Sequence, residues 1–216
     1  VINTPPTAVT GATITSPVAI YPITVAGGLD DNYDFDYVSG MLTITKATLT
    51  ATADNQSRAY GSTNPTLTIS YSGFLNGDVP SDLDTGPTAA TTATITSPVA
   101  TYSITVAGGS DDNYDFNYVS GALTITKATL SATADNQSRA YGSPNPTFTI
   151  SYSGFVNGDD VSDLDTAPTA TTTATITSPV ATYSITVAGG SDDNYDFNYV
   201  SGTLTITKAT LTITAK

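Results

Sequence analysis

The chain is a tandem repeat with a period of 81 residues, and this period sets the scale on which it can fold. Lys46, Lys127 and Lys208 occupy equivalent positions, and residues 47–127 align with residues 128–208 without a gap and with only nine differences. Residues 1–46 match the second half of the same unit, and residues 209–216 match its first strand. Stacked solenoid repeats span about 20 to 45 residues, so this longer period predicts one compact module per repeat. We therefore predict a truncated module at 1–46, full modules at 47–127 and 128–208, and the start of another at 209–216.

Within a repeat, apolar residues alternate with small polar ones, as in Leu49, Ala51 and Ala53 with threonine between them. The helical spacing of i, i+3, i+4 and i+7 is absent, so the pattern predicts an all-β fold with about six or seven strands per repeat. Residues 76–92 are rich in Gly, Pro and Asp and predict a loop with at most one short edge strand. Ser120 and Gly121 predict a tight turn that forms a C-terminal β-hairpin.

A repeat of this size with this number of strands favours a small Ig-like β-sandwich. A β-grasp-like module and strand-swapped, intertwined modules remain alternatives. Residues 121–134 contain no turn signal, which predicts a near-continuous strand from one module to the next. Leu123 and Ile125 stand at odd positions whereas Leu130 and Ala132 stand at even ones. Because a shift of one residue turns a strand over, the buried face is expected to change sides near Lys127.

The composition excludes several classes of function. The net charge is −13, all acidic residues are Asp, and only six residues are basic, which disfavours binding to nucleic acid or to anionic lipid surfaces. No apolar run approaches the roughly 20 residues of a membrane-spanning helix, so no direct membrane insertion is expected. Cys and His are absent, which removes thiolate nucleophiles and the commonest acid/base group. We expect no enzymatic activity, and a chain so rich in Thr, Ser, Gly and Asn suits an extracellular β-protein.

Several segments, in this order, resemble the MBG repeat of bacterial surface proteins, a family named as mostly β and glycine-rich. They are the stretches KATLTATADN (46–55), AYGSTNP (59–65), YSGFLNGD (71–78), SPVATYSITV (97–106) and NYDFNYVSGALTITK (113–127). The chain departs from the family pattern in its extra Asp residues at 111, 112 and 115. The resemblance covers nearly the whole chain and implies tandem stalk modules in large secreted or surface-anchored, adhesin-like proteins, with no catalytic residues.

Aspartates at one point of each repeat are candidate calcium ligands, because carboxylate oxygens are the ligands that calcium prefers. These candidates are Asp111, Asp112 and Asp115 in one repeat and Asp192, Asp193 and Asp196 in the next. The sixth-position Gly and the twelfth-position acid of an EF-hand loop are missing. A strand with a solvated polar face also explains the alternation, and we expect no calcium effect on stability and no other cofactor.

Two further motifs suggest chemistry. Tyr60 lies in a loop near Arg58, and Tyr141 near Arg139, so these are weak candidates for an exposed ligand-binding surface such as a sugar-stacking platform. The single lysine of each repeat, such as Lys127, could form an isopeptide bond to Asn, but we favour a solvated edge lysine that discourages aggregation.

These patterns favour a structural function. We expect a stalk segment of a large bacterial surface or secreted adhesin whose modules contact their neighbours in the same chain and project a distal binding domain of unknown ligand. The alternative is a ligand-binding module, repeated for avidity, that recognises a glycan or a host protein through its loops.

Overall fold

A computed structural model describes residues 1–215 of the chain. Within this range the chain consists of β-strands, two short 3₁₀ turns and loops, and it contains no helix long and apolar enough to cross a membrane. The chain forms two compact units. Unit 1 contains Val1–Asn55, Thr66–Thr91 and Ser103–Ala122; unit 2 contains Gln56–Pro65, Thr92–Tyr102 and the described residues from Leu123 onward. Residues 128–208 therefore lie wholly within unit 2, and the boundary between the units falls inside residues 47–127.

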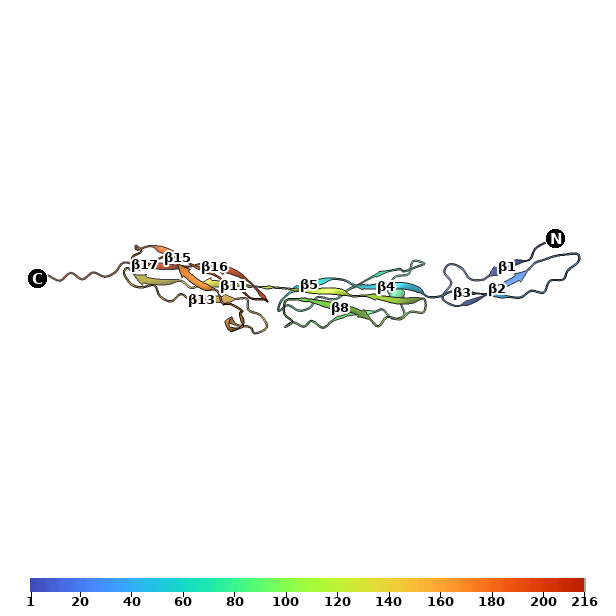
Figure 1. The fold of residues 1–216 in the computed structure, drawn as a ribbon, viewed down its shortest axis with the longest axis horizontal. Coiled ribbons are helices and arrows are strands. Elements are labelled where there is room, and N and C mark those ends of the chain that lie inside the picture. Colours follow the sequence, from blue (N-terminus) through green and yellow to red (C-terminus); the bar gives the residue numbers. More distant parts are fainter. Residues whose placement is uncertain (216) are drawn as a thin grey trace. The chain divides into compact units, whose positions relative to one another are not determined.

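The repeat at residues 128–208 has seven strands (Figure 1). They are β11 (Ala128–Ala134), β12 (Gln137–Ala140), β13 (Ile150–Ser153), β14 (Thr169–Thr172), β15 (Thr182–Ala188), β16 (Tyr195–Val200) and β17 (Gly202–Thr207), with a 3₁₀ turn at Val161–Asp163. The repeat before it has the same elements. They are β4 (Ala47–Ala53), β5 (Gln56–Ala59), β6 (Ile69–Ser72), β7 (Thr88–Thr91), β8 (Thr101–Ala107), β9 (Tyr114–Val119) and β10 (Gly121–Thr126), with a 3₁₀ turn at Pro80–Asp82. Residues 1–46 contribute β1 (Thr7–Thr10), β2 (Ile20–Ala26) and β3 (Gly40–Thr43).

Each full repeat builds two sheets. In residues 128–208 these are a three-stranded sheet of order β13-β11-β16 and a four-stranded sheet of order β12-β17-β15-β14. Strand β11 runs antiparallel to β13 and parallel to β16, and β12 runs parallel to β17. The short strand predicted within residues 76–92 is β7, which lies at the edge of its sheet as expected. The all-β class and the repeated two-sheet modules are confirmed.

The core of residues 128–208 lies between the two sheets. Side chains of β11, β15 and β17 form one cluster, together with Ala174: Ala132, Ala134, Ile185, Val187, Leu204 and Ile206. These residues alternate with exposed or half-buried threonines and serines, which is the period-two pattern of a strand buried on one face. Alanines in β11 face larger aliphatic groups in the opposite sheet, so the two layers approach closely. The sandwich prediction was based on this alternation, and the strands show the alternating burial.

The predicted C-terminal hairpin is wrong. Strands β16 and β17 are consecutive, but they belong to different sheets, so the residue between them carries the chain from one layer to the other. Gly202 begins β17 against β11, where a Cβ on Gly202 would lie 2.3 Å from the main-chain oxygen of Ala134. The glycine that the sequence offers as a turn residue therefore serves a close approach of two backbones.

The segment between consecutive repeats is nearly continuous strand. Strand β10 ends at Thr126, β11 begins at Ala128, and Lys127 alone lies between them. Leu123 and Ile125 are buried on β10, and Leu130 is buried on β11, so the buried face changes sides at Lys127 as predicted. Strand β11 pairs only with strands of its own repeat, so the strand-swapped alternative is wrong. The β-grasp alternative needs a helix, and the described residues contain no α-helix.

Candidate functional site

The feature most relevant to function is the junction between consecutive repeats within unit 2. This unit contains residues 56–65, 92–102 and 123–127 of the first full repeat together with all of residues 128–208. Besides the chain connection at Lys127, loops of the two repeats contact each other directly. We call this set of contacts the junction; its members are Tyr60, Gly61, Ile95 and Val99 on one side and Val156, Asn157, Asp159, Asn194 and Tyr195 on the other.

Tyr60 is the central side chain of the junction. It directly follows β5, and its main-chain N–H donates to the oxygen of Thr126 at the end of β10, 2.8 Å away. Its hydroxyl donates to Oδ2 of Asp159 at 3.1 Å. Its ring meets the ring of Tyr195 edge to face, with 5.6 Å between the centroids. Such aromatic pairs add roughly 0.5 to 1.5 kcal/mol beyond their buried area.

Asp159 joins two tyrosine hydroxyls from different repeats. The hydroxyl of Tyr195 donates to the same Oδ2 atom at 2.7 Å, and it also accepts from the main-chain N–H of Val156 at 3.0 Å. The Asp159 carboxylate is thus held in place by a hydrogen bond within its own repeat, independently of Tyr60. The hydrogen bond from Tyr60 is made to a preformed acceptor, which lowers the conformational cost of closing the junction.

The glycine after Tyr60 is required by the junction. Gly61 has a φ of +75°, and a Cβ at this position would lie 2.3 Å from Cγ2 of Val156. The equivalent Gly142 has a similar φ of +84°, but a Cβ there would meet nothing within 4 Å. Both glycines therefore adopt a positive φ that favours glycine. Only at Gly61 does the neighbouring repeat also leave no space for a side chain.

Asparagine side chains complete the junction. The main-chain N–H of Val99 donates to Oδ1 of Asn194 at 2.9 Å, and Nδ2 of Asn157 donates to the oxygen of Ile95 at 3.5 Å. Within unit 1, the N–H of Val18 donates in the same way to Oδ1 of Asn113 at 3.0 Å. An asparagine therefore contacts the preceding repeat in the same way in unit 1, through Asn113, and in unit 2, through Asn194.

The burial of the junction changes the ionisation of its tyrosines. A hydrogen bond with Asn157 lowers the pKa of Tyr60, but burial and the neighbouring Asp159 outweigh it, so the pKa of Tyr60 is raised above its ordinary value. Burial also raises the pKa of Tyr195, and the hydrogen bond to Asp159 adds to the shift. Both hydroxyls therefore keep the protons that they donate to Asp159 throughout the neutral range.

The equivalent position in unit 1 is open. A cavity of about 360 Å³ is lined by residues equivalent to both sides of the junction, among them Ile14, Leu75, Asp78 and Tyr114. Tyr141, the equivalent of Tyr60 in residues 128–208, is 47% exposed, whereas Tyr60 is 8% exposed. Exposure of this tyrosine thus depends on whether a following repeat is present in the structure.

The sequence placed Tyr60 in an exposed loop, and this expectation is wrong. Arg58 is also buried: its Nε donates to Oδ1 of Asn64 at 2.7 Å and its Nη2 donates to the oxygen of Thr94. Arg139 makes the same contacts with Asn145 and Thr175. These arginines tie loops of their own repeat together, and of the four weak ligand-binding candidates only Tyr141 has an exposed side chain.

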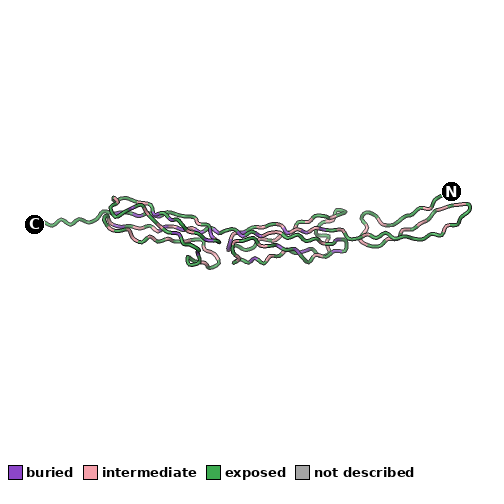
Figure 2. Tube along the Cα trace, in the orientation of Figure 1, coloured by how far each residue is buried: buried purple, intermediate pink, exposed green. Residues whose placement is uncertain are grey.

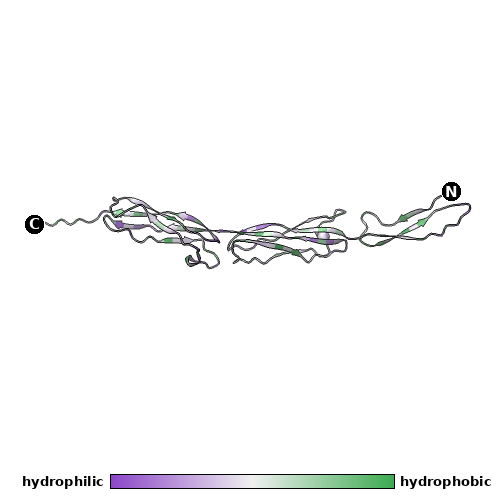
Figure 3. Ribbon diagram, viewed as in Figure 1, coloured by the Kyte–Doolittle hydropathy of each residue, from purple (hydrophilic) through white to green (hydrophobic). Residues whose placement is uncertain are grey.

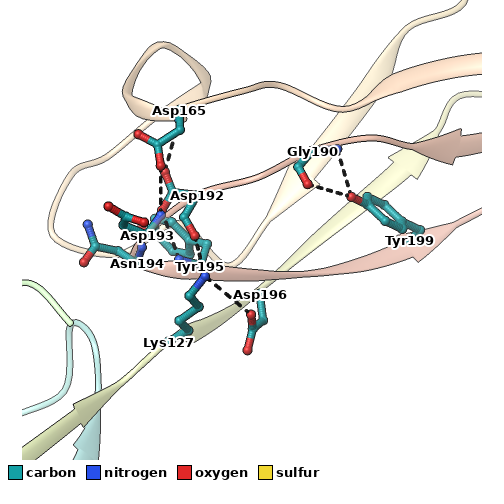
Figure 4. Close-up of polar contacts among 9 residues, drawn as sticks. All are labelled: Lys127, Asp165, Gly190, Asp192, Asp193, Asn194, Tyr195, Asp196 and Tyr199. Atoms are coloured by element: carbon teal, nitrogen blue, oxygen red, sulfur yellow. Dashed lines mark hydrogen bonds and ion pairs between the residues drawn. The ribbon is translucent and has the colours of Figure 1, made fainter. Parts of the chain in front are cut away.

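Two of the six candidate calcium ligands, Asp111 and Asp192, accept hydrogen bonds from the main chain with their side chains; Figure 4 shows those of Asp192. Asp192 is 8% exposed; its Oδ1 accepts from the N–H groups of Asn194 and Tyr195 at 2.7 and 3.0 Å. Its Oδ2 accepts from the N–H of Asp165 at 3.3 Å, and Oδ2 of Asp165 accepts from the N–H of Asp193 at 3.0 Å. These bonds fold the loop that enters β16 and present Asn194 to the junction.

The same loop occurs one repeat earlier, where Asp111 accepts from Asn113 and Tyr114 and where Asp84 accepts from Asp112. Asp115 and Asp196 are the second residues of β9 and β16, and Oδ1 of Asp196 lies 3.9 Å from Nζ of Lys127 (Figure 4). Among residues 1–215, no three His, Cys, Asp or Glu side chains lie in a group that could hold a metal ion. In both repeats, two aspartate side chains of this loop, Asp84 with Asp111 and Asp165 with Asp192, accept main-chain hydrogen bonds.

The lysine at each repeat boundary contacts the same loop. Nζ of Lys127 donates to the main-chain oxygen of Asp192 at 2.7 Å and lies 3.9 Å from Oδ1 of the exposed Asp196. Nζ of Lys46 donates to the oxygen of Asp111 at 2.6 Å. This repeated contact holds the single residue between β10 and β11 against the repeat that follows. The lysine amine considered for an isopeptide bond thus donates a hydrogen bond to a main-chain oxygen.

Sequence reasoning missed the role of Tyr60, Asp159 and Asn194 in the junction. The available signal was the Tyr-Gly pair, which recurs in a turn-rich stretch of each full repeat, at Tyr60 and at Tyr141. A glycine after a large aromatic residue allows the backbone to turn while another chain segment approaches closely. The partners of that pair stand about 100 residues away, and nothing local identifies them.

Comparison with solved structures gives low similarity. A crystal structure of Drosophila N-cadherin EC1-4 is 10% identical with a TM-score of 0.24, covering 87% of this chain and 58% of that chain. A crystal structure of Drosophila N-cadherin EC1-3 is 10% identical with a TM-score of 0.24, covering 90% of this chain and 78% of that chain. This chain thus spans less than two thirds of the EC1-4 chain, and such scores support no argument about function. No curated protein matches the sequence.

Comparison with protein families gives a definite result. The family described as MBG domain (YGX type) matches residues 49–124 and again residues 130–205. Both ranges contain a Tyr-Gly-Ser stretch, at Tyr60 and at Tyr141, and the first of these provides the central side chain of the junction. The chain therefore belongs to the MBG domain (YGX type) family and carries two such domains in tandem.

Proposed function

We propose that this chain is a non-catalytic spacer segment of a large secreted or surface-anchored bacterial protein, and that its repeats set the distance between an anchor and a distal binding domain. The observation that carries the proposal is the junction in unit 2. A single residue, Lys127, separates β10 from β11, and side chains of both repeats close the remaining space.

The contacts of the junction suit a spacer because they restrain rotation. A flexible linker of several residues lets two domains reorient freely. Here Tyr60 makes both a hydrogen bond to Asp159 and an edge-to-face contact with the ring of Tyr195, and the N–H of Val99 donates to Asn194. These contacts at two points, together with the chain connection at Lys127, oppose bending and twisting.

The surface composition supports an extracellular array. Near-identical neighbouring domains are prone to misassembly and aggregation, and a net charge of −13 with only aspartate as acid keeps copies of the repeat apart in solution. We place the parent protein at the bacterial surface or in its secreted fraction, with neighbouring repeats of the same chain as its direct partners.

The experiment compares spacer length with attachment in the parent protein. Whole 81-residue units are deleted, and attachment of cells to the natural target surface is measured at several repeat numbers. A spacer predicts a loss that is graded with length and is restored by unrelated stiff domains of equal length.

The 216-residue chain supplies the control in the same assay. Added in excess to the medium, a spacer leaves attachment unchanged. If the added chain blocks attachment by competition, the repeats carry the binding site and the spacer proposal is wrong.

A further inference from the structure

The loop between β13 and the 3₁₀ turn of residues 128–208 contains a chemically reactive pair, Asn157 and Gly158. Among the asparagines of the chain, only Asn76 and Asn157 directly precede a glycine. In such a pair the main-chain nitrogen of the glycine can attack the asparagine side chain with little steric hindrance, because glycine has no Cβ. The other asparagines precede Thr, Tyr, Gln or Pro, whose side chain or ring hinders the same attack.

The backbone of this turn keeps the attacking nitrogen free. Asn157 and Gly158 have φ values of +58° and +89°. One hydrogen bond closes the turn, from the N–H of Asp159 to the main-chain oxygen of Val156 at 3.0 Å. Among the described residues, the N–H of Gly158 has no hydrogen-bond acceptor. A Cβ built on Gly158 would meet nothing within 4 Å, so there is space around the peptide group that reacts.

The turn is also accessible to water, since Asn157 and Gly158 are both exposed. In the full repeats the buried positions lie mainly along the strands (Figure 2), as do the hydrophobic ones (Figure 3). The turn lies in a loop outside the strands. A loop of this kind opens locally without unfolding of the sheets, which allows the rotation about the main chain of Asn157 that ring closure requires.

We propose that Asn157 is a site of spontaneous deamidation and that the reaction loosens the junction as the protein ages. The nitrogen of Gly158 bonds to Cγ of Asn157, the bond from Cγ to Nδ2 breaks, and Nδ2 leaves as ammonia with the proton from the Gly158 nitrogen. Water then opens the five-membered succinimide ring. Its addition at Cγ gives aspartate, and its addition at the main-chain carbonyl carbon gives isoaspartate. An amide and water thus become a carboxylic acid and ammonia, without oxidation or reduction.

The side chain of Asn157 contributes hydrogen bonds to the junction that the reaction removes. Its Nδ2 donates to the main-chain oxygen of Ile95 at 3.5 Å, and its amide forms a hydrogen bond with the hydroxyl of Tyr60. A carboxylate only accepts hydrogen bonds, and the single proton of the Tyr60 hydroxyl is already donated to Asp159. Deamidation therefore places one acceptor against another at both contacts.

The products also change the charge and the backbone of the junction. Either acid adds a negative charge two residues from Asp159, whose Oδ2 accepts from Tyr60 and from Tyr195, and like charges repel. Isoaspartate lengthens the main chain by one methylene group inside the turn that positions Asp159. This inference goes beyond the spacer function, because it concerns the chemistry of the turn whether or not the repeats act as a spacer.

Ageing of the full chain at physiological temperature and mildly alkaline pH tests the reaction. Peptide mapping by mass spectrometry should find aspartate and isoaspartate at Asn157, whereas Asn136, which precedes Gln137, keeps its amide. Isoaspartate identifies the ring intermediate, because direct hydrolysis of the side chain gives aspartate alone. A peptide of residues 152–162 gives the rate without the fold. If Asn157 keeps its amide in the chain while the peptide converts completely, the proposal is wrong.

Hydrogen exchange tests the effect on the junction. Asn157→Asp reproduces one product, and Asn76→Asp is the matched control at the equivalent turn in unit 1. Exchange of the Val99 N–H, which donates to Asn194, should accelerate about three- to tenfold in Asn157→Asp, the range for loss of one ordinary hydrogen bond. It should also accelerate in the aged wild-type chain and stay unchanged in Asn76→Asp. Unchanged exchange in both Asn157→Asp and the aged chain would overturn the proposed loosening.

Discussion

Replacement of one hydroxyl group tests whether the junction stabilises consecutive repeats. Tyr60→Phe keeps the ring contact with Tyr195 but removes the hydrogen bond to Asp159. Hydrogen bonds to charged groups contribute about 1.5 to 3 kcal/mol. Because Asp159 keeps its bond from Tyr195, we expect the lower end, about 1.5 kcal/mol. The matched variant is Tyr141→Phe, at an exposed equivalent position, where about 0.5 kcal/mol or less is expected.

The assay is urea unfolding of the full chain followed by circular dichroism, together with thermal melting. For a chain of this size about 1.5 kcal/mol corresponds to a fall in Tm of roughly 3 to 6 °C for the part that unfolds cooperatively. Hydrogen exchange adds a local readout, since the N–H of Val99 donates across the junction to Asn194. Its exchange should accelerate in the Tyr60→Phe variant and not in the Tyr141→Phe variant. Equal destabilisation by the two substitutions would show that the junction does not stabilise the pair of repeats.

Three further outcomes are expected. Gly61→Ala should lower Tm more than Gly142→Ala in parallel melts, because both strain a positive φ but only the first clashes with Val156; equal shifts would contradict the packing argument. The junction should weaken as pH rises above about 10, the ordinary tyrosine pKa. The raised pKa of Tyr60 means that its stabilisation is complete below that pH and is lost as the hydroxyl ionises; exchange of the Val99 N–H measured against pH checks this. Millimolar calcium should leave Tm within about 1 °C of its value in chelator, since an ion that binds the folded state must raise Tm; a rise of several degrees would show a site.

Much of the strand structure follows from local sequence. Alternation of apolar and small polar residues places the strands and identifies their buried faces, because successive side chains of a strand point to opposite sides. The change of parity between Ile125 and Leu130 locates the change of buried face at Lys127, and the structure has it there. Near-identity of the two repeats also predicts that their elements recur, as they do.

Sequence reasoning failed where the answer depended on partners far along the chain. Gly121 and Gly202 have the local signal of a hairpin turn, but the next strand joins the other sheet. Which sheet a strand joins is decided by which edge offers it a partner, and β17 pairs with β12 from residues much earlier in the repeat. A turn signal reports only the local backbone conformation.

The candidate site shows the same difference between what local sequence indicates and what contacts between distant residues decide. The sequence by itself determined that Tyr60 and Gly61 belong to a recurring turn-rich stretch, and that aspartates gather at one point of each repeat. Only the tertiary structure decided that Tyr60 is buried against the next repeat and that Asp192 accepts main-chain hydrogen bonds. The physical reason is that burial is a property of the assembled pair of repeats: the same tyrosine is exposed at Tyr141, where the structure contains no following repeat to cover it.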